Sequence, residues 1–103
     1  MTVSPFIART EDVLAVARRL LPLGISVYAH ECSCVHFGSW SVVAGIEHER
    51  FQFRWDGRTS TFVISRGVLA DGKRVWDPVR TLNLLHPEAI SGTEAFLRER
   101  FTT

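Results

Sequence analysis

The 103-residue chain contains neither a long apolar run nor an excess of charge of either sign. No window approaches the roughly 20 apolar residues that a membrane-spanning helix needs. The first residues also lack the basic segment and apolar stretch of a secretory signal peptide. The sequence therefore predicts a cytoplasmic protein with no membrane association. A net charge of +1 argues against nucleic acid as a partner, because nucleic-acid modules usually carry a strong basic excess.

Cysteine is scarce as well, with only two in the chain. A small secreted scaffold held by disulfides would carry more, so we expect reduced thiols in a reducing compartment. The apolar content of 46% and the charged content of 22% are ordinary for a globular protein. We therefore expect one domain over residues 1–103, with residues 1–9 as a flexible arm.

A helix is predicted over residues 11–21. Thr10 offers a hydroxyl cap, and the carboxylates of Glu11 and Asp12 suit the first turn of a helix. Apolar residues then recur at helical spacing, and Pro22 follows. The apolar set is Val13, Val16, Ala17, Leu20 and Leu21.

A second helix is predicted over residues 92–101. Ser91 and Glu94 fit the capping box, in which each side chain accepts a hydrogen bond from the other residue's backbone amide. This helix would place Ala95, Phe96 and Phe101 against the sheet.

Between the helices the apolar period changes to two. Residues 25–30 alternate in the way expected of a half-buried strand, and residues 40–44 are apolar enough for an interior strand. Residues 47–55 and 58–66 flank Asp56-Gly57, a dipeptide that suits a two-residue type I′ hairpin turn. That turn would set Trp55 opposite Arg58.

The predicted hairpin has one apolar and one polar face. Its apolar face holds Phe51, Phe53, Trp55, Phe62 and Ile64, and its water-facing side holds Arg50, Gln52, Arg54, Thr59 and Thr61. A smaller hairpin is predicted over residues 68–76 around Asp71-Gly72, ended by Asp77-Pro78. Residues 79–90 are expected to be an irregular packed segment or a short helical turn.

These elements predict an α+β fold of two layers. An antiparallel sheet of about four or five strands would carry an N-terminal and a C-terminal helix. Short turns between successive strands favour antiparallel pairing, so both helices should cover one face of the sheet.

The sharpest motif is the segment His-Glu-Cys-Ser-Cys-Val-His, residues 30–36. On a regular strand His30, Cys32, Cys34 and His36 would project from one face, and all four types bind zinc or copper. Neighbouring side chains of such a row stand about 6.6 Å apart, so a straight strand offers one metal at most two of them. Four ligands would require a fold-back of the chain, His48 or a second subunit.

In the same segment the alternation of side chains conflicts with the polarity of the residues. If Ile25, Val27 and Ala29 face the core, Glu31 and Ser33 do so too, and a lone buried carboxylate is costly. We therefore expect a bulge, bend or turn near residues 31–33.

Two further chemistries remain open for this segment. A disulfide between Cys32 and Cys34 would sit at the upper limit of the tolerated Cα separation. A cysteine nucleophile paired with a histidine would lack a third orienting group. Because no acid and base can be assigned as a pair, enzyme activity is not the leading hypothesis.

The leading hypothesis is a non-enzymatic binding or protein-interaction module without a cofactor, plausibly a homodimer. Three tryptophans and seven phenylalanines are many for two thin layers, and aromatic residues outside the core are typical of interfaces. The predicted interaction surface comprises Trp40, Arg50, Gln52, Arg54 and Trp76. The competing hypothesis is a zinc- or copper-binding or thiol-active protein centred on residues 30–36.

Overall fold

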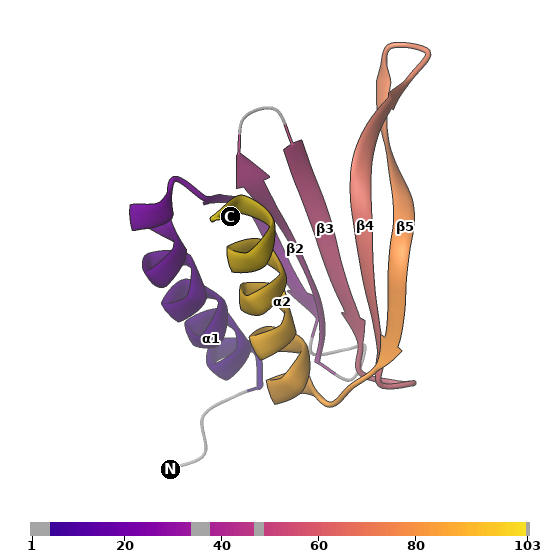
Figure 1. Ribbon diagram of the computed structural model, residues 1–103. Coiled ribbons are helices and arrows are strands. Elements are labelled where there is room, and N and C mark those ends of the chain that lie inside the picture. Colours follow the sequence, from indigo (N-terminus) through magenta and orange to yellow (C-terminus); the bar gives the residue numbers. More distant parts are fainter. Residues whose placement is uncertain (1–4, 34–37, 47–48, 103) are drawn as a thin grey trace.

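Two helices and five strands form two layers (Figure 1). The computed structural model describes the backbone of residues 5–33, 38–46 and 49–102, with side chains from residue 10 onward. Both helices lie on the same face of the sheet, which confirms the predicted two-layer α+β fold. The elements are α1 (Pro5–Leu20), a 3-10 turn (Leu21–Leu23), β1 (Ser26–Ser33), β2 (Ser39–Ile46), β3 (Glu49–Asp56), β4 (Thr61–Ala70), β5 (Lys73–Asn83) and α2 (His86–Phe101).

The sheet is a simple meander in the order β1-β2-β3-β4-β5, with every neighbouring pair antiparallel. Short connections between successive strands produce this arrangement, as the sequence predicts. The two edges are therefore β1 and β5. Neither helix of the described part of the chain is long and apolar enough to cross a membrane.

The core lies between the helices and the face of the sheet that they cover. Phe53 and Phe62 are fully buried at its centre, with ring centroids 6.3 Å apart, and Phe96 of α2 packs 5.7 Å from Phe53. The five aromatic and aliphatic residues predicted for this face of the hairpin are all buried. Contributions from the helices are Val13, Val16, Leu20, Ala89, Thr93 and Leu97.

Helix α1 begins at Pro5, six residues before the predicted start. Proline is well tolerated in the first turn of a helix, where its missing N–H leaves no intrahelical bond unmade. Thr10 and Glu11 therefore lie inside the helix, and the predicted cap at Thr10 is wrong. Leu21, predicted as part of the apolar stripe, belongs to the 3-10 turn and is 65% exposed.

Strand β1 contains the expected irregularity, but at another position. The register shifts between Val27, opposite Ala44, and Ala29, opposite Val43, so that Tyr28 is the extra residue. From Ala29 to Ser33 the pairing is continuous, and the predicted break at residues 31–33 is wrong. The bulge turns Ala29 and Glu31 away from the helices and thus resolves the conflict over the carboxylate.

The β3–β4 connection is longer than predicted. Asp56 pairs with Thr61 and Trp55 with Phe62, which leaves four residues in the loop, and the predicted pairing of Trp55 with Arg58 is wrong. The Asp56 carboxylate accepts a bond from the Arg58 backbone N–H at 2.9 Å, which forms a local turn of its own. Within this loop, the residue with a positive φ angle is Ser60, at 52°. The partner of Trp55 moves by four residues, from Arg58 to Phe62; because four is even, the predicted faces survive.

The second hairpin has the predicted turn but much longer strands. Asp71 and Gly72 have φ angles of 52° and 75°, and Ala70 pairs with Lys73. Strand β5 then continues to Asn83, so Pro78 does not end it and the prediction of an irregular segment after residue 78 is wrong. Proline fits here because β5 is an edge strand and Val79 forms a bulge beside Pro78.

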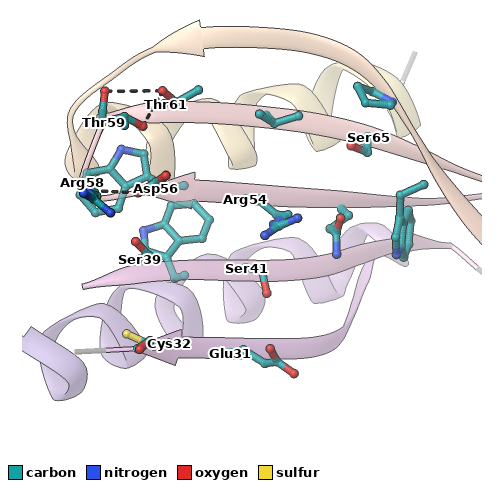
Figure 2. A pocket seen from close by; sticks show the side chains of 17 residues that line it. Glu31, Cys32, Ser39, Ser41, Arg54, Asp56, Arg58, Thr59, Thr61 and Ser65 are labelled. Atoms are coloured by element: carbon teal, nitrogen blue, oxygen red, sulfur yellow. Dashed lines mark hydrogen bonds between the residues drawn. The ribbon is translucent and has the colours of Figure 1, made fainter. Parts of the chain in front are cut away.

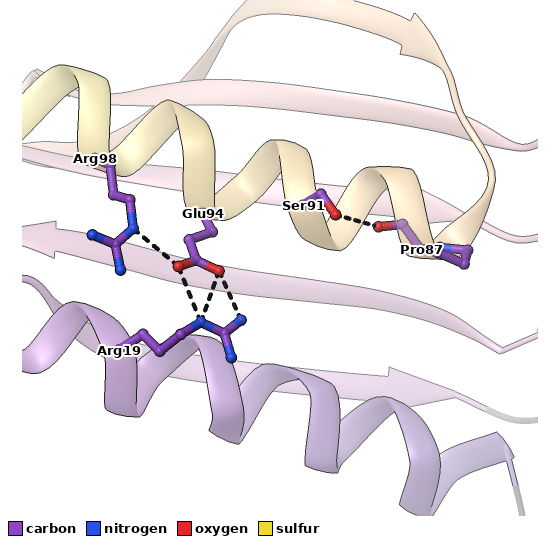
Figure 3. A network of polar contacts seen from close by, with 5 residues as sticks. All are labelled: Arg19, Pro87, Ser91, Glu94 and Arg98. Carbon is purple, nitrogen blue, oxygen red and sulfur yellow. Dashed lines mark hydrogen bonds and ion pairs between the residues drawn. The ribbon is translucent and has the colours of Figure 1, made fainter.

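Helix α2 begins at His86 rather than at residue 92. Pro87 occupies the first turn. The carboxylate at the start of the helix is that of Glu88 rather than Glu94, and it accepts a hydrogen bond from the backbone N–H of Leu85 at 3.3 Å. The predicted capping box at Ser91 is wrong, because the Ser91 hydroxyl donates to the Pro87 carbonyl within the helix (Figure 3). This longer helix buries Ala89, Thr93 and Leu97. Phe96 and Phe101 pack against the sheet as predicted, both in contact with Phe51. Ala95 is exposed, so its predicted place against the sheet is wrong.

An ion-pair cluster joins the helices on their outer side (Figure 3). Glu94 of α2 receives Arg19 of α1 at 2.7 Å and Arg98 of its own helix at 3.0 Å. The hydrogen bond from Arg19 is the main reason that the pKa of Glu94 lies below its ordinary value. Arg100 similarly joins the end of α2 to Glu49 of β3.

Candidate functional site: the uncovered face of the sheet

Several polar groups of the face beneath the helices are hydrogen-bonded. Trp40 donates its indole N–H to Nδ1 of His86 at 2.9 Å, and Nε2 of His86 lies 2.8 Å from the Asp12 carboxylate. The Nδ1 acceptor role places the ring hydrogen on Nε2, which donates to Asp12. Trp55 donates to the Leu84 carbonyl at 2.8 Å. These bonds tie β2 and β3 to the start of α2 and, through His86, to the middle of α1.

The opposite face of the sheet carries no helix (Figure 1). Residues from all five strands line a shallow groove of about 920 Å³ on it. Its main lining residues are Glu31, Ser39, Ser41, Gln52, Arg54, Thr61, Val63, Ser65, Trp76 and Pro78. We call this surface the open face.

Strand pairing fixes the order of side chains on the open face. Ser41 of β2 is opposite Glu31 of β1 on one side and Arg54 of β3 on the other, and Val63 of β4 is opposite Arg54. Figure 2 shows Glu31, Ser41 and Arg54 in one row across three neighbouring strands. With strands about 4.8 Å apart, the Cα atoms of Glu31 and Arg54 are roughly 10 Å apart.

The charges of this row are exposed and have no ion-pair partner in the described part of the chain. Neither Glu31 nor Arg54 makes an ion pair with another described residue, in contrast to Glu94 and Glu49 on the helix side. Arg58 and Asp56 add one further charge of each sign at the β3–β4 end of the groove. The open face is therefore nearly neutral as a whole but has separate positive and negative positions.

Strand β2 contributes small side chains to the open face. Ser39, Ser41 and Val43 are half-buried and alternate with the buried Trp40, Val42 and Ala44, whereas Gly45 is buried too. Gly45 is required by its backbone, because a Cβ there would lie 2.2 Å from the Glu49 carbonyl oxygen. The face is low along Ser39 and Ser41, with longer side chains on both sides, but near Gly45 the Arg50 side chain extends from β3 to the Tyr28 ring of β1.

Most of the predicted interaction surface lies here. Gln52 and Arg54 line the groove, Trp76 is half-buried at its β5 side, and Arg50 lies nearby with its guanidinium carbon 3.8 Å from the centre of the Tyr28 ring. Trp40 is the exception, since it is only 3% exposed and its ring packs in the covered layer. The apolar character of residues 40–44 already indicated an interior strand. It was a better guide to the position of Trp40 than the number of aromatic residues in the chain.

The predicted metal segment is only partly described. His30 is opposite Val42 and Cys32 is opposite Trp40, so both lie on the helix side of the sheet, as the alternation of the motif predicts. Both are half-buried, and burial lowers the pKa of His30. Cys34 and His36 lie outside the described residues, as does His48. Within the described ranges no three histidine, cysteine, aspartate or glutamate side chains gather as metal ligands would.

Sequence reasoning missed Glu31, Ser41 and Ser65 as lining residues of one groove. It expected a break in β1 that would keep Glu31 out of the core, but at residues 31–33, because nothing in the sequence marks Tyr28 as the bulged residue. The hydroxyl residues of β2, at alternate positions between apolar ones, were the available signal. No protein-family model, curated protein or solved structure matches the chain.

Proposed function

We propose that the protein is a non-enzymatic protein-binding module whose recognition surface is the open face. The observation that supports this most directly is the contrast between Glu94 and Glu49, which form ion pairs on the helix side, and the exposed Glu31 and Arg54 of the open face, which form none among the described residues. A solvated sheet face is common in antiparallel sheets. A concave face that combines a half-buried tryptophan with unpaired arginine and glutamate has the composition of an interface.

The two sheet edges are less suited to binding. Strand β5 carries Pro78, a bulge at Val79 and the cations Lys73, Arg74 and Arg80, all of which discourage the addition of another strand. Strand β1 is interrupted by the bulge at Tyr28. The proposal therefore assigns recognition to the face, with a partner protein or a second copy of this chain as its occupant.

Site-specific photo-cross-linking in the producing cell tests this proposal. A cross-linking amino acid at Gln52, in the middle of the groove, should give covalent adducts that disappear when Arg54→Glu is added. The same amino acid at Arg18, exposed on α1, is the matched control and should give none. Equal labelling from both positions, or none from Gln52, would contradict the proposal.

A second candidate function is binding of zinc or copper by residues 30–36. It is favoured by His30, whose Nε2 atom is buried without a hydrogen-bond partner among the described residues, next to Cys32 on the same side of β1. Such a nitrogen is costly to bury unless something binds it. His30 and Cys32 would supply two ligands, with Cys34 and His36 as the remaining candidates.

Elemental analysis of protein purified without chelator distinguishes this candidate. Stoichiometric zinc or copper in the wild type, and its loss in the Cys32→Ser, Cys34→Ser double variant, would support it. A metal-free wild type that remains metal-free after incubation with either ion and desalting would rule it out.

A further inference from the structure

The open face has a charge arrangement that is complementary to itself. Glu31 and Arg54 stand on either side of β2, in one row, and both are exposed. A row that holds one unpaired anion and one unpaired cation, placed symmetrically about a line, can pair with a copy of itself turned about that line. Such two-fold contacts are the commonest type in homo-oligomers.

We infer that a second copy of this chain docks on the open face, with Glu31 of each copy paired to Arg54 of the other. This inference rests on the proposed function and names its partner. The two-fold axis runs along β2, so that β2 lies over β2 of the second copy and β1 lies over its β3. Two ion pairs then form for every dimer, because the contact is isologous.

The shape of the groove suits this arrangement. Ser39, Ser41 and Val43 of the two β2 strands would face each other at the axis, and their small side chains let the sheets approach to about 10 Å, the usual spacing of packed sheets. Arginine and glutamate side chains on the flanking strands are long enough to meet across that spacing. The low centre and taller sides of the open face thus match a copy of themselves.

The remaining strands would fit around the dimer rather than obstruct it. With the axis on β2, strands β4 and β5 of each copy extend past the β1 edge of the other. Trp76 and Pro78, which line the β5 side of the groove, would lie two strands beyond that edge, roughly 10 Å to the side.

The contact area limits the strength of the dimer. Three strands of eight residues overlap over about 370 Å² of sheet per copy, compared with roughly 800 Å² per partner in a standard stable interface. The dimer should therefore be weak and reversible, and it should dissociate as salt screens its ion pairs.

Charge reversal provides the decisive experiment. Sedimentation equilibrium at low salt, from about 10 μM to about 1 mM protein, should show self-association of the wild type. Glu31→Arg and Arg54→Glu should each weaken it by at least about tenfold, because each places like charges at both contacts. An equimolar mixture of the two variants should associate again, since every contact in the mixed dimer is attractive.

Matched controls and contrary outcomes complete the test. Glu11→Arg on α1 and Arg80→Glu on β5 change the same charges away from the contact and should associate like the wild type, and circular dichroism should show all variants folded. A wild type that is monomeric at the highest concentration would overturn the inference, as would variants that associate unchanged. If Gln52 then still cross-links to a different protein, the proposed function survives without self-docking; if it cross-links to nothing, both fail.

Discussion

The two faces of the sheet differ in composition, although their side chains alternate along the same strands. On the covered face the side chains are apolar, and the buried indole N–H groups of Trp40 and Trp55 have acceptors. On the open face charged and hydroxyl residues stand side by side without ion pairs among the described residues. The first face stabilises the fold, and the second carries the groups available for recognition. Mutations on the two faces should therefore separate stability from binding.

The largest expected difference is between Phe53→Ala and Val63→Ala. Phe53 is fully buried under α2, and its truncation should lower the free energy of unfolding by about 3–5 kcal/mol. Val63 is half-buried on the open face and should lose less than about 1 kcal/mol. Urea denaturation followed by circular dichroism measures both. Equal losses would show that the open face is also covered in solution.

A smaller difference is expected between two tryptophans. Trp40→Phe removes the indole donor to His86 and leaves a cavity, so it should cost about 1–3 kcal/mol of stability. Trp76→Phe keeps an aromatic ring on the open face and should stay within about 0.5 kcal/mol of the wild type. Thermal unfolding at low protein concentration checks this pair. A large loss for Trp76 would make it part of the folding core.

The smallest expected effect concerns the charged cluster on the helices. Glu94→Gln breaks the bonds to Arg19 and Arg98, but Arg19 is half-exposed and solvent screens the pair. The loss of stability should therefore be smaller than that of Trp40→Phe. Because its pKa is lowered on folding, Glu94 contributes fully above its ordinary pKa of 4.5, and the contribution disappears as the pH falls through the lower pKa of the folded protein.

Urea midpoints of the wild type and Glu94→Gln across acidic pH test this dependence. The two midpoints should differ near neutral pH and converge as the carboxyl of the folded wild type becomes protonated. Glu11→Gln, on an exposed position of α1, is the control and should show no such convergence. A difference that grows on acidification would contradict the assigned direction of the pKa shift.

The sequence was most informative where a side chain has an apolar partner. Alternation assigned Phe51, Phe53 and Ile64 to the buried face correctly. The wrong loop length did not change this assignment, because the register between β3 and β4 differs from the predicted one by an even number of residues. Element boundaries were less predictable. Pro78 and Pro87 read as breaks in the sequence, yet an edge bulge and a first helical turn accept them.

The open face was predictable only in part. The polar half of the hairpin pattern predicts Arg50, Gln52 and Arg54, since polar residues at alternate positions indicate a side of the strand that faces water. Glu31 does not, because its side of the sheet depends on a bulge that the sequence does not mark. Nor does local pattern show that Glu31 and Arg54 flank Ser41, which requires the pairing of three strands.

The bulge at Tyr28 also separates two kinds of chemistry within five residues. One additional residue in β1 sends the imidazole and thiol of His30 and Cys32 to the dry side, and the carboxylate of Glu31 to the wet side. A strand one residue shorter at this point would place the Glu31 carboxylate under the helices and turn the thiol of Cys32, a residue that already borders the groove, toward the open face. The length of this short segment, more than its composition, thus determines which reagents and partners can reach each group.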